Sequence, residues 1–221
     1  IGDEQLLCGG CGAKVGSESL NAVLENISKT HQKGVLAGIG DDAAVIEVKS
    51  STQIITTDHL REFNSDLWMF SRITAVHALG DIWAMGGEPL AVMAHIIIPE
   101  ASKWVQESWL NQIMLASNDV FKNVGAHIVG GHTSIGAEFN IGFSITGTTP
   151  RNPMLISGAK PGDALVITKP IGSGTILAGE MQLKAKGRFV ESALEWMAKP
   201  QAEASKILSV ATAMTDVTGF G

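Results

Sequence analysis

Residues 65–98 read SDLWMFSRITAVHALGDIWAMGGEPLAVMAHIII, and this stretch decides the fold class. Its first part predicts a helix over 65–85. A break with two glycines and a proline follows, and the β-branched apolar run after it predicts a strand over 91–98. Apolar runs and helical stretches alternate in the same way along the rest of the chain, as expected when helices cover a sheet. The sequence therefore predicts an α+β or α/β fold.

Further elements follow from the same patterns. The other strands are expected at residues 43–48, 53–57, 127–129, 140–146 and 164–168, and the other helices at 17–27, 102–124, 174–185 and 192–214. The proline- and glycine-containing stretch 149–163 predicts a turn-rich connection between two domains. Too few elements follow it to close a core, so the second domain, 160–221, is expected to be incomplete.

Composition excludes several classes of protein. The net charge of −6 at pH 7 argues against binding to a nucleic-acid backbone. The longest apolar run, 90–98, is shorter than the roughly 20 residues of a membrane helix, so no membrane span is expected. Two cysteines are too few for a disulfide framework, which favours a cytoplasmic location. The start at Ile1, without a signal-peptide pattern, suggests a piece trimmed from a longer or fused protein.

The glycine-rich stretch CGGCGAKVG, residues 8–16, carries both cysteines and a lysine. The Cys-x-x-Cys spacing suits half of a zinc site or a redox pair. It also suits an arm that delivers a nucleophile, since the ammonium of Lys14 would lower the pKa of the Cys11 thiol. The residues alone leave these alternatives open.

Two adjacent carboxylates, Asp41 and Asp42, follow Gly38-Ile39-Gly40. The glycines resemble a dinucleotide fingerprint, but a strand is expected after them where that fingerprint needs a helix. The carboxylates would repel a pyrophosphate unless a cation such as Mg²⁺ intervened. Because side chains alternate along extended chain, only one of the two is expected to face the ion. An ordinary surface turn is the alternative.

Three more carboxylates lie in positions that favour a site. Asp58 ends a β-rich run, and Asp216 precedes a turn-rich segment suited to a site loop. Asp81 lies within the apolar stretch 73–85, where it must be paired, hydrogen-bonded or bound to a cation. His77 lies one helical turn before Asp81, on the same face, and is interpreted as a buried structural partner. Separated acids without a Walker lysine motif favour a carboxylate-held Mg²⁺ nucleotide.

A glycine pair, Gly130-Gly131, follows the apolar run 126–129 and precedes His132. Such glycines allow close backbone approach, and their amides can hold phosphate oxygens. An ordinary turn is the alternative.

Taken in order, six segments resemble the selenophosphate synthetase (selenide, water dikinase) family of the PurM-like, or aminoimidazole ribonucleotide synthetase-like, superfamily. They are CGAK (11–14), DDAAV (41–45), TTD (56–58), ALGDIWAMGGEP (78–89), GGHT (130–133) and MTDVTGFG (214–221). The acidic segments are shared across the superfamily, which includes thiamine-monophosphate kinase. The first segment and GGHT are more specific to the selenide enzymes.

The resemblance implies a fold and a reaction. The fold is an α+β, PurM-like α/β sandwich, in which the sheet of the N-terminal domain (17–150) pairs with that of a second subunit into a β-barrel. A homodimer is therefore implied. The reaction converts ATP, selenide and water to selenophosphate, AMP and phosphate, with Mg²⁺ and commonly K⁺. The alternatives are another superfamily enzyme, such as thiamine-monophosphate kinase, and a non-catalytic Cys-x-x-Cys metal or redox module.

The resemblance also implies residue roles. Residues 1–16 form a mobile arm that presents Cys11 and Lys14 for catalysis. The implied metal ligands are Asp42, Asp81 and Asp216. The implied ATP contacts are Lys14, Ile39, Gly40, Asp41, Asp58, Asp81, Gly130, Gly131 and His132. One departure is His77, which stands where many members carry asparagine. Another is the end at Gly221, because family chains continue beyond this point.

Overall fold

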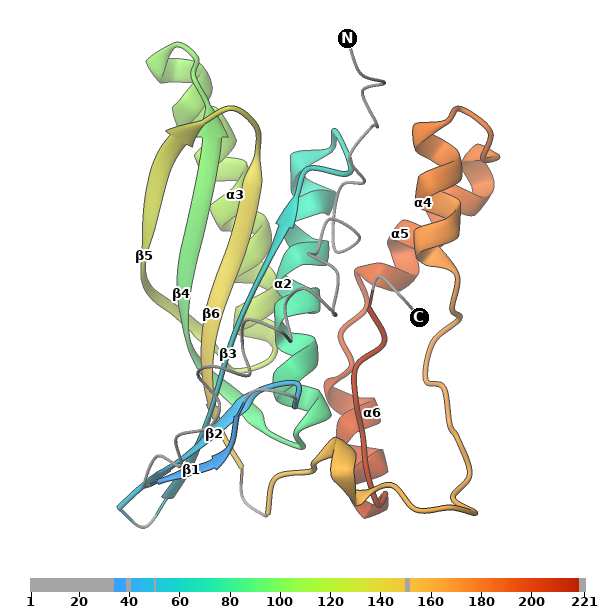
Figure 1. Ribbon diagram of the computed structural model, residues 1–221. Coiled ribbons are helices and arrows are strands. Elements are labelled where there is room, and N and C mark those ends of the chain that lie inside the picture. Colours follow the sequence, from blue (N-terminus) through green and yellow to red (C-terminus); the bar gives the residue numbers. More distant parts are fainter. Residues whose placement is uncertain (1–33, 39–40, 50, 150–151, 219–221) are drawn as a thin grey trace, which may run out of the picture.

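The structure is a computed structural model and describes residues 34–38, 41–49, 51–149 and 152–218. In this part of the chain a mixed six-stranded sheet carries its helices on one face (Figure 1). The sheet order is β1-β2-β3-β6-β4-β5, and all neighbours are antiparallel except β4 and β5. The strands are β1 (Val35–Ala37), β2 (Ala44–Val48), β3 (Ser51–Arg61), β4 (Glu88–Pro99), β5 (His127–Gly136) and β6 (Asn140–Thr148).

Two long helices, α2 (Leu67–Ala84) and α3 (Lys103–Asn123), cover the inner face of the sheet. Burial alternates along β4: Val92, Ala94, Ile96 and Ile98 face the helices. Helix α3 connects β4 to β5, because parallel neighbours need a crossover rather than a tight turn. Core packing includes an edge-to-face contact between Phe121 and Phe143, with ring centroids 4.9 Å apart. The predicted α+β fold is confirmed, with a mixed sheet.

Helix α2 has sharply defined ends. Asp66 caps its start, since Oδ1 accepts hydrogen bonds from the backbone N–H groups of Trp68 (2.9 Å) and Met69 (3.1 Å). Gly86 follows its end with φ of 68°, a left-handed conformation that favours glycine. The chain then turns back into β4. These ends fix which residues of the last helical turns face β3.

The segment after β6 packs against α2 on the side away from the sheet (Figure 1). It contains η2 (Ile156–Gly158), α4 (Ser173–Met181), α5 (Gly187–Met197), α6 (Ala202–Ile207) and η3 (Leu208–Val210). Ser205 Oγ donates a 2.7 Å hydrogen bond to the Trp83 carbonyl oxygen, and Leu194 and Met197 pack against the core. The predicted division into residues 1–16, 17–150 and 160–221 stays a prediction.

Two expectations about the elements were wrong. The strand expected at 164–168 does not form, and Leu165 is 97% exposed, because no described strand lies beside this segment to pair with it. The helix expected over 192–214 is instead α5 followed by α6, since Pro200 lacks the N–H group that a continuous helix needs. The alternative of an ordinary turn at 130–133 does not hold either, because these residues lie within β5.

The glycines of β5 allow a close approach of two strands. Gly131 pairs with Ala94 of β4, and a Cβ atom at Gly131 would lie 2.2 Å from the Ala94 carbonyl oxygen. Close approach, which the sequence did suggest, is therefore the role of this glycine in the ladder. The helix expected at 17–27 lies outside the described residues. None of the described helices combines the length and apolar composition needed to cross a membrane.

Candidate active site

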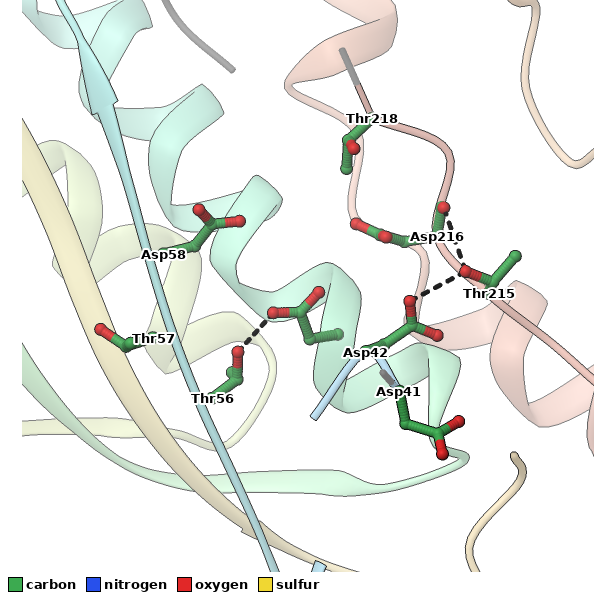
Figure 2. A pocket seen from close by; sticks show the side chains of 9 residues that line it. Asp41, Asp42, Thr56, Thr57, Asp58, Thr215, Asp216 and Thr218 are labelled. Atoms are coloured by element: carbon green, nitrogen blue, oxygen red, sulfur yellow. Dashed lines mark hydrogen bonds between the residues drawn. The ribbon is translucent and has the colours of Figure 1, made fainter. Parts of the chain in front are cut away.

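An acidic pocket lies where β2 stops covering the edge of β3. Their pairing runs from Val48–Ser51 to Ala44–Ile55, so β3 beyond Ile55 has no β2 neighbour. Asp41 and Asp42 immediately precede β2 and reach this uncovered edge. The pocket has a volume of about 420 Å³ (Figure 2) and is lined by Asp41, Asp42, Thr56, Thr57, Asp58, Asp81, Thr215, Asp216 and Thr218.

Three carboxylates converge in this pocket from distant parts of the chain. Asp42 comes from the bend just before β2, Asp81 from α2 and Asp216 from the C-terminal segment. Each offers one oxygen, and the three oxygens lie within 4.8 Å of one another. Like charges at this separation repel, so the cluster is stable only with bound protons or a cation. Carboxylate oxygens are ligands suited to Mg²⁺.

Asp81 is the most perturbed of the three. Burial raises the pKa of Asp81 to about 7, and the negative charges of Asp216 and Asp58 add to the rise. A hydrogen bond from the Thr56 hydroxyl and the nearby His77 oppose it. Near neutral pH the Asp81 carboxyl group is therefore partly protonated. It must lose this proton when it binds a metal ion.

Asp42 shows a similar but smaller effect. Burial raises the pKa of Asp42 to about 6, with Asp216 and Asp41 adding to the rise. Thr215 Oγ1 opposes it by donating a 2.8 Å hydrogen bond to Oδ1. The second oxygen, Oδ2, is buried and has no hydrogen-bond partner among the described residues. A buried carboxylate oxygen in this position is suited to binding a metal ion.

The two neighbouring carboxylates, Asp41 and Asp58, line the pocket but lie outside the three-carboxylate cluster. Asp41 Oδ1 accepts a 3.0 Å hydrogen bond from the Ile156 N–H group, so Asp41 is turned away from the cluster, as the alternation of side chains predicts (Figure 2). Asp58 Oδ2 lies 2.8 Å from His77 Nε2 across the contact between β3 and α2.

The structure does not bring every predicted site residue together. Gly130, Gly131 and His132 lie on β5, which is separated from β3 by β6 and β4, and they do not line the pocket. Cys11, Lys14, Ile39 and Gly40 lie outside the described residues.

Two threonines donate hydrogen bonds to carboxylates of the cluster, but they were not predicted as site residues from the sequence. Thr56 lies two residues before Asp58 on the same face of β3, and Thr215 immediately precedes Asp216. Their sequence proximity to carboxylates was the available signal.

A second cavity, of about 580 Å³, lies between α2 and the C-terminal helices. It shares Thr215, Asp216 and Thr218 with the acidic pocket, so the two spaces adjoin. Its walls are mainly apolar, and burial lowers the pKa of Lys169 on its wall to about 8, with the charge of Lys199 adding to the effect.

Comparison with known proteins gives a domain match and shows the fold. The family model "AIR synthase related protein, N-terminal domain" matches residues 40–149. Thiamine monophosphate kinase from Aquifex aeolicus superposes with a TM-score of 0.72 at 18% identity, covering 91% of this chain and 67% of that one. AaThiL complexed with AMPPCP and TMP gives a TM-score of 0.68 at 19% identity, covering 86% and 61%. Residues 40–149 thus match an AIR synthase related N-terminal domain, and the likeness to the two solved structures shows the fold.

Sequence similarity is more specific. The selenide, water dikinase of Desulfitobacterium hafniense is 35% identical over 220 residues, which cover 96% of this chain and 64% of that protein. Nearly all of this chain is thus similar in sequence to a protein of that name. The chain spans just under two thirds of the length of that relative.

Proposed function

We propose that the protein containing this chain is a selenide, water dikinase, which uses ATP, selenide and water to make selenophosphate, AMP and phosphate. The observation that carries the proposal is the convergence of Asp42, Asp81 and Asp216 within 4.8 Å, in a chain whose relative bears that name. Phosphoryl transfer depends mainly on positioning and on neutralising phosphate charge, which is what a carboxylate-held cation provides.

Mg²⁺ is the proposed cation, held by Asp42, Asp81 and Asp216. When bound, it would neutralise phosphate oxygens of the nucleotide. The fit rests on the donor set and on the buried Oδ2 of Asp42, which has no hydrogen-bond partner in the described part of the chain. A requirement for K⁺ stays a prediction from the family resemblance.

ATP is the proposed nucleotide. AaThiL, which shares the fold, was solved in complex with AMPPCP, and this supports nucleotide binding by this chain. Asp41, Asp58 and Asp81 line the pocket and are its proposed contacts in the described chain. The other contacts proposed from the resemblance are Lys14, Ile39, Gly40, Gly130, Gly131 and His132.

A homodimer is proposed from the outer face of the sheet. Leu90, Met93 and Ile97 of β4 point away from the helices and are 55%, 44% and 36% exposed, and Val129 and Ile135 of β5 are 64% and 60% exposed. An apolar sheet face of this kind suits packing against a second subunit. Because two strands separate 130–132 from the pocket of their own chain, their proposed ATP contact requires the pocket of the other subunit.

Cys11 and Lys14 are the proposed catalytic residues, on an arm formed by residues 1–16. The thiolate of Cys11 would act as the nucleophile and Lys14 would offset phosphoryl charge. A cytoplasmic location is proposed with them, since a free thiol must stay reduced.

Phosphorus NMR of the whole protein that contains this chain tests the proposal. With ATP, Mg²⁺ and selenide under anaerobic conditions, we expect selenophosphate and AMP. Cys11→Ser should abolish selenide-dependent ATP consumption, while the matched control Cys8→Ser should retain it. ADP as the sole stable product would support a simple kinase such as thiamine-monophosphate kinase. Stoichiometric zinc in the purified protein would support the Cys-x-x-Cys metal module.

A further inference from the structure

His77 forms a close contact with one carboxylate of the acidic pocket. Its Nε2 atom lies 2.8 Å from Asp58 Oδ2, and the two side chains are only 12% and 15% exposed. The contact joins α2 to β3 at the part of β3 that β2 leaves uncovered. When the imidazole carries its proton, the contact is an ion pair.

The pocket gives this contact a particular setting. Five aspartates line the pocket, and no lysine or arginine is among its described lining residues. Carboxylates crowded together in this way repel one another, and a side chain on a strand can rotate away from its neighbours. A partner that can carry positive charge, fixed on a helix, opposes that rotation at Asp58.

One turn of α2 organises three of the pocket carboxylates. His77 contacts Asp58, and Asp81 contributes its own carboxylate, which is hydrogen-bonded by Thr56. Between them, Gly80 lies against Asp216: a Cβ atom at Gly80 would be 3.0 Å from Asp216 Oδ2. The residues from 77 to 81 therefore arrange the acids of β3, of α2 and of the C-terminal segment around one space.

We infer that His77 is a positioning residue, which holds the Asp58 carboxylate toward the pocket so that its orientation is set before the nucleotide binds. The inference rests on the proposed function, because it concerns how the same pocket binds Mg²⁺ and nucleotide. Removing a group that orients a metal-ligating side chain typically costs about 10- to 100-fold in affinity or activity, and an effect at the lower end is expected for a carboxylate that contacts the nucleotide.

The test measures binding of AMPPCP with Mg²⁺ by calorimetry to the whole protein and its variants. His77→Leu removes the partner of Asp58 and is expected to weaken binding about tenfold. His77→Gln keeps an N–H group near the position of Nε2 and is expected to recover most of the loss. Gln112→Leu, at an exposed position on α3 away from both cavities, is the control and should bind like the native protein. Should His77→Leu fail to fold, His77→Met, a good helix former, replaces it with the same expected loss.

A double-mutant cycle shows whether His77 acts through Asp58. In an Asp58→Asn background, His77→Leu is expected to change the affinity by less than about twofold, because the orienting contact is already lost. A full loss in that background would overturn the positioning role, as would native-like binding by His77→Leu alone. If the native protein itself binds no AMPPCP with Mg²⁺, the proposed function fails, which is distinguishable from a failure confined to the variants.

Discussion

Replacing Asp81 with asparagine should stabilise the protein in the absence of metal. The folded state raises the pKa of Asp81 from 3.8 to about 7, chiefly through burial. The folded state therefore holds a proton that the unfolded state releases between these two pH values, and the side chain costs stability progressively as the pH rises through this window. Asparagine carries no charge and avoids that cost, while its carbonyl oxygen can still accept the hydrogen bond from Thr56.

The magnitude follows from the shift. A difference of about 3 pKa units corresponds to about 4 kcal/mol once both states are ionised, since each unit is worth 1.36 kcal/mol. We therefore expect Asp81→Asn to raise the free energy of unfolding by roughly 2–4 kcal/mol at pH 8. At pH 4 the effect should fall to about 0.5 kcal/mol, because the carboxyl group is then protonated in the folded state and only about half ionised in the unfolded state.

Urea unfolding in EDTA at pH 4 and pH 8 measures this directly. Asp119→Asn is the control, because its carboxylate pairs with Arg72 at the surface of the molecule. That change should lower stability by at most about 1 kcal/mol. Added Mg²⁺ with AMPPCP should stabilise the native protein but not Asp81→Asn, since ligand binding to the folded state adds stability. An Asp81→Asn variant that is less stable than the native protein at pH 8 without metal would refute the reasoning.

Three further predictions concern the cluster and the fold. The affinity for Mn²⁺ and Mg²⁺ should rise between about pH 5 and pH 8, because the raised pKa values of Asp42 (about 6) and Asp81 (about 7) lie in this range. Calorimetry in buffers of different ionisation enthalpy should detect the protons released on binding. An affinity that does not change with pH would contradict the assignment of these carboxylates as metal ligands. Asp66→Ala removes the cap of α2 and should lower the free energy of unfolding by about 1 kcal/mol in urea titrations, whereas Asp66→Asn should lose little. Gly131→Ala should destabilise the protein by about 1–3 kcal/mol, because the added methyl group meets the Ala94 carbonyl oxygen; unchanged thermal stability would show that β5 does not pair as described.

The sequence predicted the elements whose pattern is local. Strands β2, β3, β4 and β6 appeared as β-branched runs, and α2 and α3 as long helical stretches. Residues 130–133 were harder, because a glycine pair is typical of turns and only the parallel pairing with β4 shows that it serves close approach. The run 164–168 has the composition of a strand, but a strand also needs a neighbour for its backbone groups.

The candidate site could be predicted from the sequence where a charged residue lies within an apolar segment. A carboxylate within the apolar helix around Asp81 had to have a partner, and the sequence indicated this directly. The spatial convergence with Asp42 and Asp216 depends on tertiary packing and could be reached only through the family resemblance. The contact between His77 and Asp58 was not visible either, since helical periodicity places His77 beside Asp81 but does not show that β3 lies opposite.

The wide separation of the clustered aspartates along the chain has a mechanical consequence. A cation held by Asp42, Asp81 and Asp216 would act as a noncovalent cross-link between the sheet, the central helix and the final described segment. Closing such long loops costs chain entropy, and the mutual repulsion of the three charges adds to that cost. The attachment of residues 211–218 to the rest of the molecule, which already includes the hydrogen bond from Thr215 to Asp42, would therefore be strongest when the ion is in place.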